Sequence, residues 1–128
     1  MIKYLHTMFR VYDLDKSTNF YTKVFGLKFV RRNDFPEKKY SLVFLGHGTK
    51  EEDIFLELTY NWKTKKYDLG NGFGHIAFSA PDLDEISRLV VENYGSVRRK
   101  PGILKTSKGK DVAFFEDPDN YVIEVIKQ

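Results

Sequence analysis

The sequence predicts an α+β fold made of two tandem βαβββ modules. The main support is an internal repeat, because residues 6–26 can be laid over residues 75–95 at a constant offset of 69. Within it, Asp13-Leu14-Asp15 falls on Asp82-Leu83-Asp84. Repeated units of this kind do not bury their hydrophobic faces alone. Pairing of the modules, within the chain or between chains, is therefore expected.

Composition supports a strand-rich domain and limits the function. The 128 residues include 11 phenylalanines and 8 tyrosines, and they contain no cysteine. Any metal must therefore be held by nitrogen and oxygen donors. The net charge of +3 is a mild excess that does not require a nucleic-acid partner. The N-terminus alternates like a strand and has no apolar leader, so we expect a cytoplasmic protein without membrane attachment.

Each half predicts a strand, a helix and three further strands within a single domain, 1–128. Apolar residues at helical spacing follow Asp13 and Asp82, which are candidate N-caps, and the helices are expected to end at Gly26 and Gly95. The predicted strands are 3–11, 27–35, 40–46 and 53–60 in the first module, and 75–80, 96–101, 111–117 and 121–127 in the second. In the repeat, Leu42-Val43-Phe44-Leu45 matches Val112-Ala113-Phe114-Phe115 at an offset of 70. A linker, 62–73, separates modules of about 1–61 and 74–128.

Two glutamates interrupt apolar strands at equivalent positions of the repeats: Glu57 in IFLEL and Glu124 in YVIEVI. A carboxylate on a half-buried sheet costs several kcal/mol unless a cation or hydrogen bonds compensate its charge. His6 and His75 begin the first strand of each repeat, so the four residues form a quasi-symmetric set. Such donors suit nickel, cobalt, iron, manganese or zinc, and positions left to water indicate a catalytic site.

The two-residue period of a strand places further polar groups beside these candidates. His6, Met8 and Arg10 share one face, as do Glu57, Thr59 and Asn61. His47 lies in a turn, GHGT, without a counterpart in the other repeat, and we interpret it as exposed rather than as a ligand. A basic stretch has three open interpretations, a solvated rim, a gate for a small anionic ligand or a nucleic-acid patch. It consists of Arg98, Arg99, Lys100, Lys105, Lys108 and Lys110.

Several stretches resemble the glyoxalase I (lactoylglutathione lyase) family of the vicinal oxygen chelate superfamily. They cover essentially the whole chain: HTMFRV from residue 6, NFY through FGL (19–27), LELTYNW from 56, YDLG from 67, GHIA from 74 and EDPDNYVIE from 116. The resemblance implies isomerisation of the methylglyoxal–glutathione hemithioacetal to S-lactoylglutathione. Proton transfer would pass through a metal-stabilised enediolate.

By the same resemblance, His6, Glu57, His75 and Glu124 match the family's metal ligands. Glu124 is the expected base, and Glu57 could share that role by symmetry. Four further residues match substrate-binding positions: Arg10 and Asn61 for the γ-glutamyl end of glutathione, and Lys105 and Lys110 for the glycyl carboxylate. The lysine match passes through an insertion around Thr106-Ser107.

The compact chain, with histidine rather than glutamine at position 6, is similar to the nickel or cobalt branch rather than the zinc branch. Relatives of this length imply a homodimer in which each metal draws a His/Glu pair from both subunits. Two alternatives remain open. One is another metalloenzyme of the same fold, a thiol transferase or a ring-cleaving dioxygenase, whose sites generally use three protein ligands. The other is a metal-free, ligand-sequestering resistance module.

Overall fold

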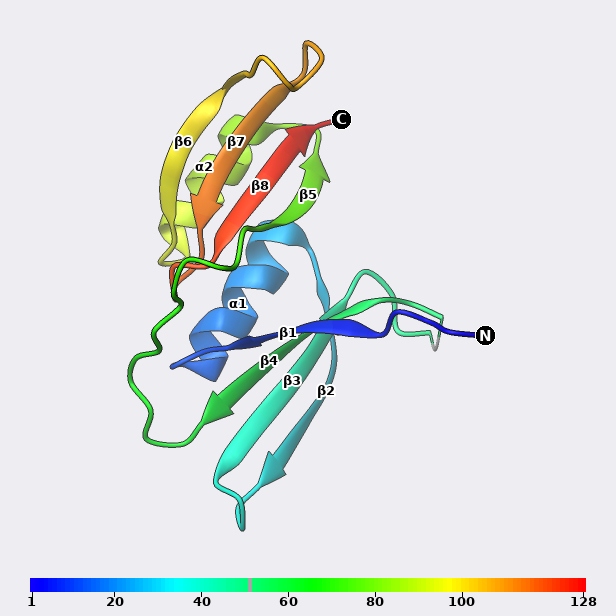
Figure 1. Cartoon of the computed structure of the whole chain (residues 1–128), viewed down its shortest axis with the longest axis vertical. Helices are drawn as coiled ribbons and strands as arrows, with labels where there is room; N and C mark the ends of the chain where they lie inside the picture. Colours follow the sequence, from blue (N-terminus) through cyan, green and yellow to red (C-terminus); the bar gives the residue numbers. More distant parts are fainter. Residues whose placement is uncertain (51) are drawn as a thin grey trace. The chain divides into compact units, whose positions relative to one another are not determined.

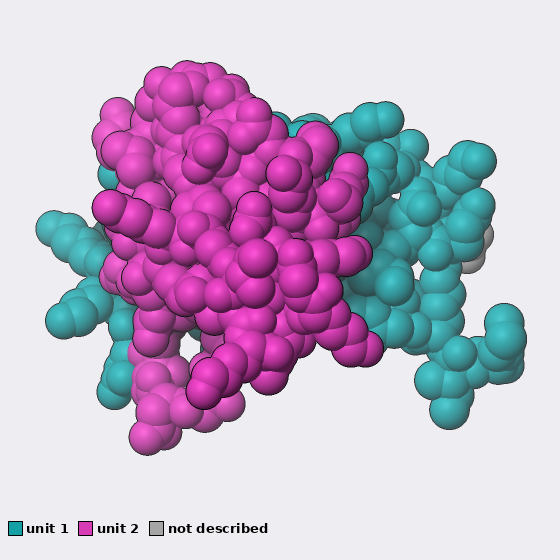
Figure 2. Space-filling view, turned by 90° about the horizontal axis from the view of Figure 1, so that it is seen from above, with its two compact units in different colours: residues 1–68 teal, residues 69–128 magenta. Residues whose placement is uncertain are grey.

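The computed structural model describes residues 1–50 and 52–128, which form two compact units. The first comprises Met1–Asp68 and the second Leu69–Gln128, coloured separately in Figure 2. Each unit contains one four-stranded mixed sheet and one helix, which confirms the two predicted βαβββ modules. The unit boundary lies inside the segment expected as a linker, while the single-domain description stays a prediction.

The first unit has the strand order β1-β4-β3-β2 (Figure 1). Its outer strand β1 runs parallel to β4, and the other neighbours are antiparallel. The elements are β1 (His6–Arg10), α1 (Leu14–Phe25), β2 (Lys28–Phe35), β3 (Tyr40–Gly46) and β4 (Phe55–Asn61). The first strand is shorter than the predicted 3–11. Just before it, the Phe55 amide donates a backbone hydrogen bond of 3.0 Å to the Leu5 carbonyl.

The second unit repeats this plan with the strand order β5-β8-β7-β6. Its elements are β5 (Ile76–Ala80), α2 (Leu83–Glu92), β6 (Ser96–Ile103), β7 (Asp111–Glu116) and β8 (Val122–Lys127). Again the first strand pairs with the last in parallel. The parallel pair brings His6, the first residue of β1, and His75, which directly precedes β5, beside the strand that ends each module. This topology positions the candidate site.

Alternation in the strands separates a helix-covered face of each sheet from an open face. In the first unit, α1 packs on β3 and β4, where Val43 and Leu58 are fully or nearly fully buried. Glu57 and Asn61 alternate with Leu58 and remain partly exposed. The second unit follows the same rule, with Phe115 and Val125 fully buried. Each module therefore buries these apolar residues under its helix and presents its glutamate on the other face.

Both helices begin at the predicted aspartates. The Asp13 carboxylate accepts a hydrogen bond from the Lys16 amide at 3.0 Å, and Asp82 does the same for the Glu85 amide, also at 3.0 Å. These bonds satisfy amides that have no partner within the helix. At the other end of α1, Gly26 adopts a left-handed conformation, with φ of 69°. No helix among the described residues is long and apolar enough to cross a membrane.

Gly26→Ala should destabilise the protein by about 1 kcal/mol, because the left-handed conformation is unfavourable for any residue with a Cβ. An added Cβ would meet no atom within 4 Å, so the cost is one of backbone conformation rather than of crowding. Urea unfolding measures the change. Gly72→Ala is the matched control, since its Cβ also meets nothing within 4 Å and its φ is not left-handed. Equal stabilities of the two variants would contradict this account.

Candidate metal centre

Each unit brings one predicted histidine against one predicted glutamate on the open face of its sheet. In the first unit, His6 Nε2 lies 2.9 Å from Glu57 Oε1. In the second, His75 Nε2 lies 3.8 Å from Glu124 Oε1. The glutamate side chains are only 13% and 21% exposed, so both carboxylates are largely withdrawn from water. Residues 49 or more positions apart in the sequence thus form two equivalent pairs.

Strand register explains why the two pairs are equivalent. In the first unit, Met8 lies opposite Glu57, and His6 precedes Met8 by two residues on the same face. In the second, Ala77 lies opposite Glu124, and His75 precedes it by the same interval. Because the side-chain period of a strand is two residues, each histidine points to the face that carries its glutamate. The parallel pairing therefore places a histidine beside a glutamate in the same way in both units.

An aromatic ring on the third strand supports each histidine. Phe44 makes an edge contact with His6 at a centroid distance of 5.3 Å, and Phe114 contacts His75 in the same way at 5.6 Å. Each phenylalanine is also the cross-strand partner of the unit's glutamate. The Arg31 guanidinium lies 4.2 Å from the centre of the Phe44 ring, a cation–π distance. These rings restrict the orientation of the imidazoles.

Among the described side chains, the first pair has a further polar partner for which the second pair has no counterpart. Thr59 Oγ1 donates a hydrogen bond of 3.0 Å to Glu57 Oε2, so both oxygens of Glu57 have a neighbour. Thr59 itself is buried. The equivalent position in the second unit, two residues beyond Glu124, is Ile126.

The other predicted residues occupy definite places around these pairs. Arg10 lies opposite Thr59 in the β1–β4 register, and Asn61 follows Thr59 on the same face. Lys110 lines a cavity of about 370 Å³ together with Glu124. Lys108 lines it too, whereas Lys105 is outside its lining. His47 is exposed in a bend, as its turn sequence indicates.

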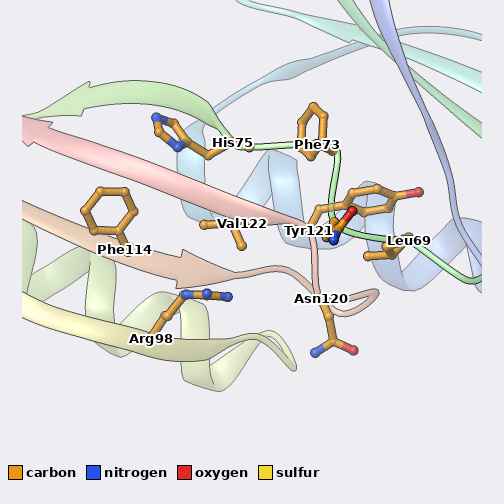
Figure 3. Close-up of a pocket in the computed structure, with 11 residues that line it drawn as sticks. Leu69, Phe73, His75, Arg98, Phe114, Asn120, Tyr121 and Val122 are labelled. Atoms are coloured by element: carbon orange, nitrogen blue, oxygen red, sulfur yellow. The ribbon is translucent and has the colours of Figure 1, made fainter.

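A second pocket of about 520 Å³ opens beside His75 within the second unit. Figure 3 shows Phe114 from β7 and Arg98 from β6 in the same pocket as His75. Asn120 and Tyr121, at the turn before β8, form another part of its lining. The buried Asp117 shapes this turn, since its carboxylate accepts hydrogen bonds from the amides of Asp119 and Tyr121, both at 2.9 Å.

The donor set fits a divalent metal. Two donors about 2.1 Å from one ion, at octahedral or tetrahedral angles, are separated by about 3.0–3.4 Å. The separations of 2.9 and 3.8 Å bracket this range. Within residues 1–50 and 52–128, no group of three or more His, Asp or Glu side chains is placed to hold a metal ion. Each pair alone thus offers two protein ligands, half of the predicted set.

Comparison with known proteins agrees with this topology. Residues 3–125 match the model of the Glyoxalase/Bleomycin resistance protein/Dioxygenase superfamily. The chain belongs to this superfamily. It is 46% identical to a lactoylglutathione lyase of Escherichia coli O157:H7, over 99% of this chain and 93% of that protein. A lactoylglutathione lyase of Neisseria meningitidis is 45% identical, over 99% of this chain and 91% of that protein.

Solved structures of glyoxalase I share the fold. The Zea mays enzyme superimposes with a TM-score of 0.89 and is 39% identical, over 98% of this chain. This chain spans 44% of the maize chain. The trypanothione-dependent glyoxalase I of Leishmania major gives a TM-score of 0.81 at 38% identity, covering 99% of this chain and 87% of that one. The resemblance to glyoxalase I noted in the sequence is thereby confirmed.

The sequence predicts both His/Glu pairs but not the groups that surround them. The repeat places Phe44 on Phe114, yet the contacts of these rings with the histidines emerge only from strand register. Parity places Thr59 beside Glu57 but does not reveal the hydrogen bond. The sequence places Arg98 only in a basic stretch and gives no signal for its position in the His75 pocket.

Proposed function

We propose that this protein is a metal-dependent glyoxalase I, an enzyme that converts the hemithioacetal of methylglyoxal and glutathione into S-lactoylglutathione. The observation that carries the proposal is that the chain contains two equivalent His/Glu pairs, each with a glutamate side chain that is largely withdrawn from water. The near full-length identity of 46% to a lactoylglutathione lyase supports the same activity. Such an enzyme would detoxify methylglyoxal, and we place it in the cytoplasm on the basis of its cysteine-free composition.

The cofactor we propose is a divalent metal, nickel or cobalt rather than zinc, held by His6, Glu57, His75 and Glu124. When bound, it would act as a Lewis acid that lowers the pKa of the carbon next to the substrate carbonyl. Two imidazoles and two carboxylates without thiolate suit these ions. Nickel or cobalt is proposed over zinc because position 6 is histidine, as in the nickel or cobalt branch of the family, rather than glutamine.

We further propose a homodimer in which each ion takes one His/Glu pair from each of two subunits. One pair supplies two donors, whereas catalytic metal sites use three or more protein ligands. A second pair is thus needed to complete the set. The two His/Glu pairs of one chain meet this need in a symmetric dimer. A two-fold axis would bring the His6/Glu57 pair of each subunit to the His75/Glu124 pair of the other, which gives two identical sites.

The residues near each pair then divide between proton transfer and substrate binding. Glu124 takes the proton from one carbon of the substrate and returns it to the neighbouring carbon. Arg10 and Asn61 bind the γ-glutamyl end of glutathione, and the guanidinium of Arg10 suits its carboxylate. Lys110 or Lys105 binds the glycyl carboxylate. The shared cavity of Lys110 and Glu124 supports Lys110 over Lys105.

The thiol is glutathione in this proposal because the full-length relatives are named lactoylglutathione lyases. The Leishmania neighbour is named for another thiol, trypanothione. The cosubstrate is therefore tested directly, by comparing glutathione with trypanothione as partners of methylglyoxal. Glutathione is expected to give the higher kcat/KM.

Metal removal tests the activity itself. The protein is stripped with a chelator, nickel, cobalt or zinc is added back separately, and thioester formation from methylglyoxal and glutathione is followed by ultraviolet absorbance. We expect no turnover after stripping and the highest activity with nickel or cobalt. If no metal restores turnover with glutathione or another small thiol, the proposal is wrong. Turnover of the stripped protein at the original rate would contradict the metal dependence.

A further inference from the structure

The two glutamates of the candidate centre differ in one respect that the repeat does not predict. Glu57 has both carboxylate oxygens engaged: Oε1 lies 2.9 Å from His6 Nε2, and Oε2 accepts a 3.0 Å hydrogen bond from Thr59. Thr59 is buried, with 7% exposure, so its hydroxyl is shielded from competition with water. The Thr59 hydrogen bond therefore restrains the Glu57 carboxylate through Oε2, the oxygen that does not face His6.

In the part of the chain that the structure describes, Glu124 has no such restraint. Its Oε1 lies 3.8 Å from His75 Nε2, beyond hydrogen-bond distance. The position equivalent to Thr59 is Ile126, whose side chain has no donor. Among the residues that the structure describes, none donates a hydrogen bond to the Glu124 carboxylate. Glu124 also lines a cavity of about 370 Å³, so there is open space beside this residue.

From this asymmetry we propose that Thr59 is a positioning residue that holds Glu57 as the fixed carboxylate ligand, while the absence of a donor at Ile126 leaves Glu124 as the mobile carboxylate. The inference rests on the proposed function and deepens it. A ligand oriented by a hydrogen bond keeps its place, whereas a proton-transferring group must approach and leave the reacting carbon. The difference between Thr59 and Ile126 thus gives the two equivalent glutamates different roles.

The experiment exchanges the donor between the two positions. Thr59→Val keeps the shape and β-branching of threonine but removes the hydroxyl, and Thr59→Ser keeps the hydroxyl as the rescue control. Ile126→Thr introduces a donor two residues beyond Glu124. For each variant, metal affinity is measured by chelator competition without substrate, kcat and KM are measured at saturating metal, and thermal melting checks folding.

We expect Thr59→Val to weaken metal binding by about tenfold or more, the usual effect of removing an outer-shell hydrogen bond, and Thr59→Ser to restore it. Ile126→Thr should retain metal binding and lower kcat about tenfold with little change in KM, because the new hydrogen bond stabilises the resting carboxylate. A folded Thr59→Val protein with unchanged metal affinity would overturn the role of Thr59. Unchanged kcat in Ile126→Thr would overturn the role of position 126.

These outcomes are distinct from failure of the proposed function. The chelator titration needs no turnover, so it tests Thr59 even in a protein that lacks isomerase activity. A wild-type protein that binds metal but does not act on the hemithioacetal would refute the glyoxalase activity alone. Unchanged metal affinity in Thr59→Val, in an active enzyme, would refute the inference alone.

Discussion

Glu124→Gln should lower kcat for the hemithioacetal by about 10²- to 10⁴-fold, the range usual for loss of a general acid–base group. Glutamine preserves the size of the side chain and an oxygen donor, but it does not accept the substrate proton. Metal must be kept saturating, because the substitution also alters a proposed ligand. Steady-state kinetics with methylglyoxal and glutathione give the change, and we expect KM to vary far less than kcat.

Two further variants make this result specific. Glu116→Gln changes a partly exposed glutamate on β7 of the same sheet and should leave kcat within about twofold of wild type. Glu57→Gln should weaken metal binding in the absence of substrate, because the fixed carboxylate would lose its charge. If Glu124→Gln kept wild-type kcat while Glu57→Gln lost it, the two glutamates would have the opposite roles.

The internal repeat explains why so much of the fold could be predicted. Similar sequences at a constant offset require similar local structures, so evidence for a helix after Asp13 also supported one after Asp82. Both aspartates do cap helices. Gly26 ends α1 as predicted, because a glycine readily takes the left-handed conformation at this position.

The prediction failed at the end of α2, which stops at Glu92 rather than near Gly95. The Asn93 side chain donates a hydrogen bond to the Leu89 carbonyl at 2.8 Å, and Tyr94 takes the left-handed conformation with φ of 72°. Because glycine is favoured in the left-handed conformation, the sequence predicts that conformation at Gly95, one residue beyond Tyr94. A bond from the Gly95 amide to the Val90 carbonyl, 2.9 Å, stabilises the turn and offsets the strain at Tyr94.

The sequence predicts those features of the candidate site that follow from the two-residue period of a strand. Parity alone places Glu57, Thr59 and Asn61 on one face, and the structure agrees. Which residue of β1 meets Glu57 depends on register, which is set by packing across the whole sheet rather than by local sequence. The pairing of His6 with Glu57 and of His75 with Glu124 is therefore a property of the folded modules.

Phe115→Ala should destabilise the second unit by about 3–5 kcal/mol, the usual cost of removing a large aromatic side chain from a core. Phe115 is fully buried on the helix-covered face of β7, between the open-face residues Phe114 and Glu116. Removing its ring leaves a cavity under α2 that the surrounding strands can fill only in part. Urea unfolding followed by far-ultraviolet circular dichroism measures the loss.

Phe29→Ala is the matched control, because it removes the same side chain where 54% of its surface is already exposed. That change should cost about 1 kcal/mol or less. The comparison also tests how the modules depend on each other. If Phe115→Ala moves one unfolding transition of the whole chain to a lower urea concentration, the two modules unfold together. This is expected of repeats that must pair to bury their hydrophobic faces. A cost for Phe115→Ala no larger than that for Phe29→Ala would contradict the core described for the second unit.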